Sequence, residues 1–156
     1  MRPARPFLGT LLRHLIDLLD GAVQEVYDDA GLEYRPRYTP VVAALEAIGP
    51  SSIRAIADHA GMTHSAVSQT VAQMARAGLI ELIAGRDARE RVATPSATLT
   101  EMMPALRRLW NATARAAREL DDELACPLSG AALEAIRVLE TRPFGDRIRQ
   151  VDFASC

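Results

Sequence analysis

The sequence predicts a mainly α-helical fold with one small β-hairpin. Hydrophobic residues make up 49% of the 156-residue chain, enough for a packed core, whereas aromatic residues make up only 4%. A core of Leu, Ile, Val and Ala favours helices over a β-sandwich. Most segments repeat apolar residues at intervals of three and four, as one face of a helix does, and only residues 79–94 have the pattern of two short strands around a turn.

The first expected helix covers residues 7–29 and ends before Gly31. Its apolar stripe, from Leu8 to Val26, is wide and rich in leucine. Because a small lobe needs only one narrow face of such a helix, the surplus indicates a partner surface. Charged residues interrupt the run, which favours an amphipathic helix over a signal peptide. No stretch reaches the ~18–20 apolar residues that cross a membrane.

Three short helices are expected next, each preceded by a capping hydroxyl. The expected caps are Thr39, Ser51 or Ser52, and Thr63. The expected inner face of the first of these helices is Val41, Val42, Leu45 and Ile48. The second and third helices are joined by a turn at Gly61, which is the arrangement of a helix-turn-helix unit.

A hairpin and two further helices complete the pattern. Strands are expected at residues 79–84 and 91–94, with Pro95 stopping the second strand. The hairpin makes the middle of the chain a winged helix-turn-helix. A long helix is expected at about 101–124, capped by Thr100 and with Pro104 in or near its first turn. Ser129 is expected to cap a last helix, which Pro143 closes.

The helix after Gly61 has an unusual exposed face. Val67, Val71 and Met74 point to one side, while the opposite side carries short polar residues rather than good helix formers. Small polar side chains suit a helix that enters a DNA major groove, because Ser, Thr and Gln can bond to bases or phosphates. The candidate DNA-binding residues on this helix are Thr63, His64, Ser65, Ser68, Gln69, Gln73 and Arg76.

Arginines also cluster in the expected wing. A hairpin tip beside such a helix can reach the DNA backbone or the minor groove, which attracts arginine. Arg86, Arg89 and Arg91 therefore join the DNA-binding candidates, and Asp87 is expected to hold a neighbouring arginine by a salt bridge. Mixed-charge turns are also common without any such role. The net charge of −2 provides no bulk attraction to nucleic acid.

The segment IRAIADHAGMTHSAVSQTVAQMARAGLIE, followed by GRDARER and then LTEMMPAL, resembles the MarR family of bacterial transcription regulators. Asp87 and Arg89 resemble the wing motif of that family. Leu99-Thr100 resembles the pair that opens its next long helix. The specific part of the resemblance is residues 53–103. The glycine that often follows the Leu-Thr pair is absent, and Pro95-Ser96 interrupts the returning strand.

The resemblance, which extends over about residues 7–140, implies a homodimeric repressor that binds a near-palindromic DNA site. It also implies a small aromatic or phenolic anion as an effector that releases DNA. The residues that could line the effector crevice are Arg13, His14, Arg37 and Tyr38. The chain then divides into a dimerisation helix and connector (1–38), a DNA-binding lobe (39–98), and C-terminal helices that complete the dimerisation region (99–156).

Other chemistry has little support in the sequence. No set of catalytic residues has a recognisable spacing, so we expect no enzyme activity and no cofactor. The three histidines have no cysteine near them, and a metal site needs three or four converging ligands. Cys126 is expected to be a packed small hydrophobe. The main alternative is a winged-helix module that binds protein with the same face; in either case a cytoplasmic location is expected.

Overall fold

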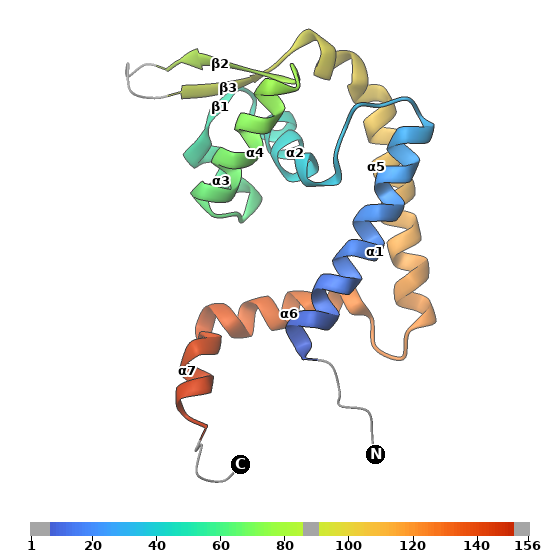
Figure 1. Cartoon of the computed structure of the whole chain (residues 1–156), viewed down its shortest axis with the longest axis vertical. Coiled ribbons are helices and arrows are strands. Elements are labelled where there is room, and N and C mark those ends of the chain that lie inside the picture. Colours follow the sequence, from blue (N-terminus) through green and yellow to red (C-terminus); the bar gives the residue numbers. More distant parts are fainter. Residues whose placement is uncertain (1–6, 86–90, 152–156) are drawn as a thin grey trace. The chain divides into compact units, whose positions relative to one another are not determined.

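The computed structural model describes residues 7–85 and 91–151 (Figure 1). It confirms a mostly helical chain with one small antiparallel sheet. The chain forms two compact units, Met1–Leu109 and Trp110–Cys156. Helix α5 (Ala97–Glu123) runs through the boundary between these units. The division into dimerisation and DNA-binding parts stays a prediction.

The first unit contains a winged helix-turn-helix lobe preceded by one long helix. Its elements are α1 (Leu8–Asp29), the 3₁₀ turn η1 (Pro36–Tyr38), α2 (Thr39–Ile48), β1 (Ser51–Ser52), α3 (Ile53–Ala60), α4 (His64–Arg76), β2 (Ile80–Ala84) and β3 (Arg91–Pro95). The strand order is β1–β3–β2, with both pairs antiparallel. Ile80 lies opposite Pro95, and Ser51 lies opposite Ala93. The short strand β1 therefore extends the predicted hairpin to three strands.

The lobe has a core of aliphatic side chains from all three of its short helices. Val41 of α2, Ile56 of α3 and Val71 of α4 are fully buried. Leu99 and Leu106 of α5 are also fully buried, so the first part of α5 belongs to this core. Burial of a Val, Leu or Ile side chain contributes roughly 1.5–3 kcal/mol. The core of the lobe is thus closed within the single chain, with the first part of α5 included.

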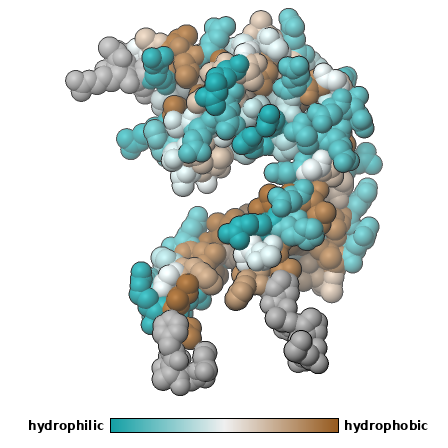
Figure 2. Space-filling view, in the orientation of Figure 1, coloured by the Kyte–Doolittle hydropathy of each residue, from teal (hydrophilic) through white to brown (hydrophobic). Residues whose placement is uncertain are grey.

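The second unit contains the rest of α5, then α6 (Leu128–Thr141) and α7 (Phe144–Arg149). Neither α6 nor α7 has a buried residue among those described. Leu133, Ile136 and Leu139 are each more than two-fifths exposed. Figure 2 shows brown, hydrophobic side chains gathered on the long helices outside the winged lobe, whereas the surface of the lobe is mainly teal. The apolar face predicted for α6 is present and stays largely exposed to solvent in the described part of the chain.

The start of α5 differs from the prediction. The helix begins at Ala97 rather than after Thr100. The buried Ser96 is its cap, because the Ser96 hydroxyl accepts a hydrogen bond of 3.2 Å from the Leu99 N–H. Thr100 instead donates its hydroxyl to the Ser96 carbonyl, a bond typical of Thr inside a helix. Pro95 does not interrupt the strand but is its last residue, at the end of β3.

Four smaller predictions also prove wrong. Thr39 is the first residue of α2 and not its cap, because the η1 turn leads directly into the helix. Ile48 is 41% exposed, and Ala44 takes its expected place in the core. Pro104 lies well inside α5. Ser129 lies within α6, where its N–H donates to the Asp121 carboxylate.

Candidate nucleic-acid interface

The turn before α4 is built by a glycine and a threonine. Gly61 ends α3 with φ +63°, a left-handed conformation that glycine adopts without strain. Thr63 then caps α4, and its Oγ1 accepts a hydrogen bond of 3.2 Å from the Ala66 N–H. Ser52 caps α3 in the same way through the Ala55 N–H. Thr63 was predicted as a cap and Ser52 was one of two predicted alternatives for α3; together they fix where α3 and α4 begin.

Helix α4 has the two faces that the sequence predicts. Val67, Val71 and Met74 have no exposed surface. Thr70 is also buried, at 7%, which the sequence analysis did not predict. Of the candidate DNA-binding residues, those that are exposed are Thr63, His64, Ser65, Gln69 and Arg76, and those that are half-buried are Ser68 and Gln73. The polar side of α4 is therefore available to a large partner.

Of the four candidate residues in the wing, only Arg91 lies in the part of the chain that the structure describes. Arg91 is exposed and begins β3, where it pairs with Ala84 at the end of β2. This pairing extends the hairpin away from the helices of the lobe (Figure 1). Arg86, Asp87 and Arg89 lie outside the described residues, so the expected salt bridge of Asp87 stays a prediction.

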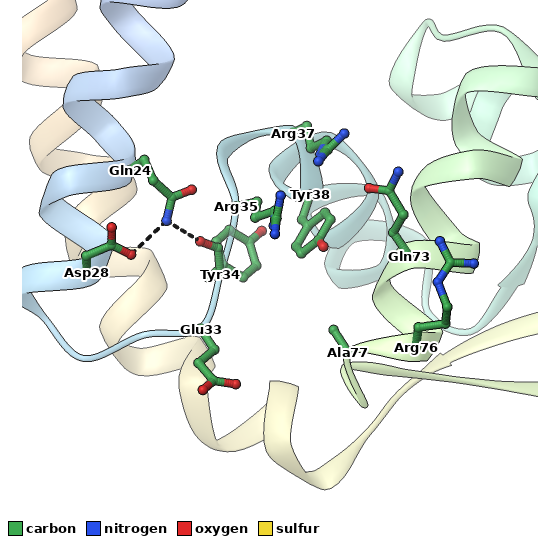
Figure 3. A pocket seen from close by; sticks show the side chains of 10 residues that line it. All are labelled: Gln24, Asp28, Glu33, Tyr34, Arg35, Arg37, Tyr38, Gln73, Arg76 and Ala77. Carbon is green, nitrogen blue, oxygen red and sulfur yellow. Dashed lines mark hydrogen bonds between the residues drawn. The ribbon is translucent and has the colours of Figure 1, made fainter.

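Beside α4 the first unit has a polar crevice of about 790 Å³ (Figure 3). Its walls come from the end of α1, the η1 connector and the end of α4. The residues that line it are Gln24, Asp28, Glu33, Tyr34, Arg35, Arg37, Tyr38, Gln73, Arg76 and Ala77. Two of the four candidate effector residues, Arg37 and Tyr38, are among them. The other two, Arg13 and His14 on α1, are not part of its lining.

Two tyrosines, Tyr34 and Tyr38, line this crevice, and the third tyrosine of the chain, Tyr27, contacts Tyr34 without lining it. The Tyr34 ring makes edge-to-face contacts with Tyr27, at 5.1 Å between centroids, and with Tyr38, at 5.6 Å. All three side chains are at least 96% buried. Burial raises the pKa of the Tyr34 hydroxyl, and the Thr39 side chain opposes this in part by lowering it. Tyr34 is thus a neutral, packed group at working pH.

One glutamine fixes the α1 side of the crevice. Gln24 Nε2 donates to the Asp28 carboxylate at 2.9 Å and to the Tyr34 carbonyl at 3.0 Å. These bonds tie the connector to α1. The residues predicted from the sequence did not include Gln24, Tyr34 or Arg35. The Arg-Pro-Arg run in the connector was the signal that could have found the last of these, because it places two arginines on either side of a rigid turn.

Cys126 is exposed in the chain, which corrects the expectation of a packed thiol. Within residues 7–85 and 91–151, no cluster of His, Cys, Asp and Glu could hold a metal ion. No helix in those same ranges is long and apolar enough to cross a membrane.

The comparisons with known proteins point to one family. Residues 31–90 match the model of the MarR family. This segment contains the helix-turn-helix, most of the wing and the connector with its two arginines. Among curated proteins, none is similar enough in sequence to count as a match.

Several solved structures share the fold. A Mycobacterium tuberculosis transcriptional regulator, MosR, solved in complex with DNA, has a TM-score of 0.67 and 17% identity, covering 89% of this chain and 100% of that one. PcaV of Streptomyces coelicolor, solved with its natural ligand, has a TM-score of 0.56 and 23% identity, covering 89% and 98%. BpsR of Bordetella bronchiseptica, whose DNA binding is regulated by 6-hydroxynicotinic acid, has a TM-score of 0.53 and 17% identity, covering 85% and 98%.

Proposed function

We propose that this chain, whose residues 31–90 match the model of the MarR family of transcriptional regulators, acts as a homodimeric repressor on a near-palindromic DNA site. A small anion, of the aromatic or phenolic kind, releases it from DNA. The family consists of DNA-binding regulators and not of enzymes. A cytoplasmic location is part of the same proposal, because the DNA that the chain would bind lies there.

The observation that carries DNA binding is the division of α4 into two faces. Its apolar side chains are fully buried, so the helix is held rigidly by the lobe. Its outward residues are short and polar, and Gln69 is exposed in the middle of that face. A glutamine can pair with adenine through two hydrogen bonds in the major groove. The free N–H groups at the start of α4 favour a phosphate.

The homodimer is supported by the uncovered apolar helices. Leu12 and Ile16 of α1 are 47% and 55% exposed, and Ile136 of α6 is 52% exposed. Large apolar patches on soluble proteins mark interaction surfaces. A two-fold dimer would carry two copies of α4, so a near-palindromic site with half-sites about 10 base pairs apart is expected.

The first test is a selection of random double-stranded DNA against the purified chain at moderate salt. An enriched near-palindrome of two half-sites is the expected result. A DNA complex also loses affinity steeply as salt rises. A chain that is dimeric but enriches no sequence would favour the protein-interaction alternative, in which α4 binds a protein instead.

The role of Gln69 can be tested on the selected site. Gln69→Ala should change the preference at one base position by about 1–3 kcal/mol, because one bidentate base contact is lost. Gln150→Ala, at an exposed glutamine after α7, is the control and should leave the preference unchanged. The measurement is the affinity for a panel of single-base variants of the site. An equal loss on every sequence would show that Gln69 contacts only the backbone.

A further inference from the structure

The crevice and the proposed DNA-binding surface share two side chains. Gln73 and Arg76 lie near the C-terminal end of α4, and both line the crevice. In Figure 3 their side chains lie on the side of the crevice opposite Gln24 and Asp28 of α1. Both are also candidate contacts to DNA. The same groups therefore face two different spaces, the crevice and the outer surface of α4.

Three arginines of the crevice have no partner within the part of the chain that the structure describes. Arg35, Arg37 and Arg76 make no hydrogen bond or ion pair with the described residues. A guanidinium offers five N–H donors and binds carboxylate or phosphate through two parallel bonds. Three such groups around one space can hold more than one acidic group.

The two acids of the crevice, Asp28 and Glu33, offset two of these three positive charges and leave one in excess. Asp28 already accepts a hydrogen bond from Gln24, and Glu33 is exposed beside it. Figure 3 draws both on the α1 side, whereas Arg37 and Arg76 lie toward α4. An anion is therefore expected to lie toward α4, where repulsion is least. The volume of about 790 Å³ is within the ~300–1,000 Å³ range of small-molecule sites.

We propose that the crevice binds a small anion carrying two acidic groups, and that this anion competes directly with DNA for Gln73 and Arg76. The second half of the proposal rests on the proposed function, because it takes DNA as the partner of α4. A side chain bonded to an anion in the crevice is not free to contact DNA. Release then needs no change in the spacing of the two DNA-binding lobes.

The site itself is tested by calorimetric titration of the full chain without DNA. The probes are benzene-1,2-dicarboxylate and benzoate, which differ by one acidic group. The dicarboxylate should bind about tenfold or more tightly than benzoate, because each charge-assisted pair is worth about one factor of ten or more. The substitution Arg37→Gln should weaken binding of the dicarboxylate by a similar factor. Arg108→Gln, at an exposed arginine of α5 outside the crevice, is the matched control and should change nothing.

Two results would overturn the site. One is no binding of the dicarboxylate by the wild-type chain. The other is binding that Arg37→Gln leaves unchanged or weakens no more than Arg108→Gln does.

The competition is tested by DNA binding at rising dicarboxylate and constant ionic strength. Direct competition raises the apparent DNA dissociation constant in proportion to the anion concentration, without a plateau. An allosteric effector reaches a plateau set by a finite coupling factor, and a plateau would overturn the competition. Arg37→Gln should still bind DNA but need about tenfold more anion for release. A chain that binds the anion through Arg37 but binds no DNA would establish the site and overturn both the proposed function and the competition.

Discussion

The winged lobe and the helices outside it contain the same kinds of apolar side chains, but the lobe buries them and the outer helices expose them. In the lobe, Val67 and Val71 of α4 are fully buried against neighbouring elements of the same chain. On α1, Leu11 and Leu18 have a similar helical spacing but are 49% and 59% exposed. Among the described residues, every exposed large hydrophobic side chain lies in residues 7–26 or 124–151, apart from Ile48 and Ile83.

This difference separates folding from assembly. The lobe closes its own core, so its stability is expected to be independent of protein concentration. The faces of α1 and α6 lose their contact with water only when another surface covers them, so their contribution appears on association. The same helical spacing of apolar residues can therefore indicate a face buried within one chain or a face buried between chains. Which of the two applies depends on the elements packed around the helix.

The largest expected effect comes from a charge in the lobe core. Val71→Asp places a carboxylate at a position with no exposed surface and no partner charge. The expected loss of unfolding free energy is about 5 kcal/mol or more, comparable to the whole stability of a small domain. Gln69→Asp, on the exposed face of the same helix, is the control and should cost less than about 1 kcal/mol. The measurement is denaturant unfolding, and a Val71→Asp chain as stable as its control would show that the lobe is not closed.

The same substitution on α6 should act on assembly instead. Ile136→Asp places a carboxylate on a face that is exposed in the single chain and covered in the proposed dimer. The dimer should weaken by about 3–5 kcal/mol, while the unfolding of the lobe is unchanged. Sedimentation velocity over a range of concentrations measures the first effect. Arg137→Asp, one residue along, is the control; equal weakening by both would place the interface elsewhere.

The sequence predicts the lobe well because its signals are local. Thr63 and Ser52 precede clear apolar stripes, and both prove to be caps. The start of α5 could not be found in the same way. Ser96 and Thr100 are equally good candidates by residue type, and only the burial of Ser96 beneath the lobe selects it. Tertiary packing, and not propensity, decided that boundary.

The crevice was harder to predict than α4. Arg37 and Tyr38 were found through a family resemblance, but Arg35 and Gln24 were not found at all. The end of α4 approaches the connector only through the fold, since about 40 residues separate Arg35 from Arg76 in the sequence. No local pattern shows that Gln73 and Arg76 face a crevice as well as a DNA-binding surface.

A smaller loss of stability is expected when a helix cap is removed, and it should be larger at the buried cap of α5 than at the exposed cap of α4. Ser96→Ala removes the acceptor for the Leu99 N–H at a position that is 8% exposed. The expected loss of unfolding free energy is about 1–2 kcal/mol, because a buried N–H is left without a partner. Thr63→Ala, at an exposed cap of α4, should cost less, since water can replace the lost acceptor. Thermal unfolding of both variants gives the comparison, and equal losses would show that burial of the cap does not matter.

The smallest effect is expected at the corresponding cap of the outer helices. Asp121 of α5 accepts a hydrogen bond of 3.1 Å from the Ser129 N–H in the first turn of α6. Hydrogen bonds from the Ser129 side chain and backbone lower the pKa of the Asp121 carboxyl. A lowered pKa means that the contribution to stability is present above the unfolded-state pKa of Asp and is lost as the pH falls through the folded-state pKa. Asp121→Ala should therefore reduce helix content slightly at neutral pH, by far-ultraviolet circular dichroism, and the difference from wild type should vanish in acid. Because this cap is exposed, its loss should leave the unfolding of the lobe unchanged; a variant that destabilises the lobe as much as Ser96→Ala would remove the distinction between the two regions.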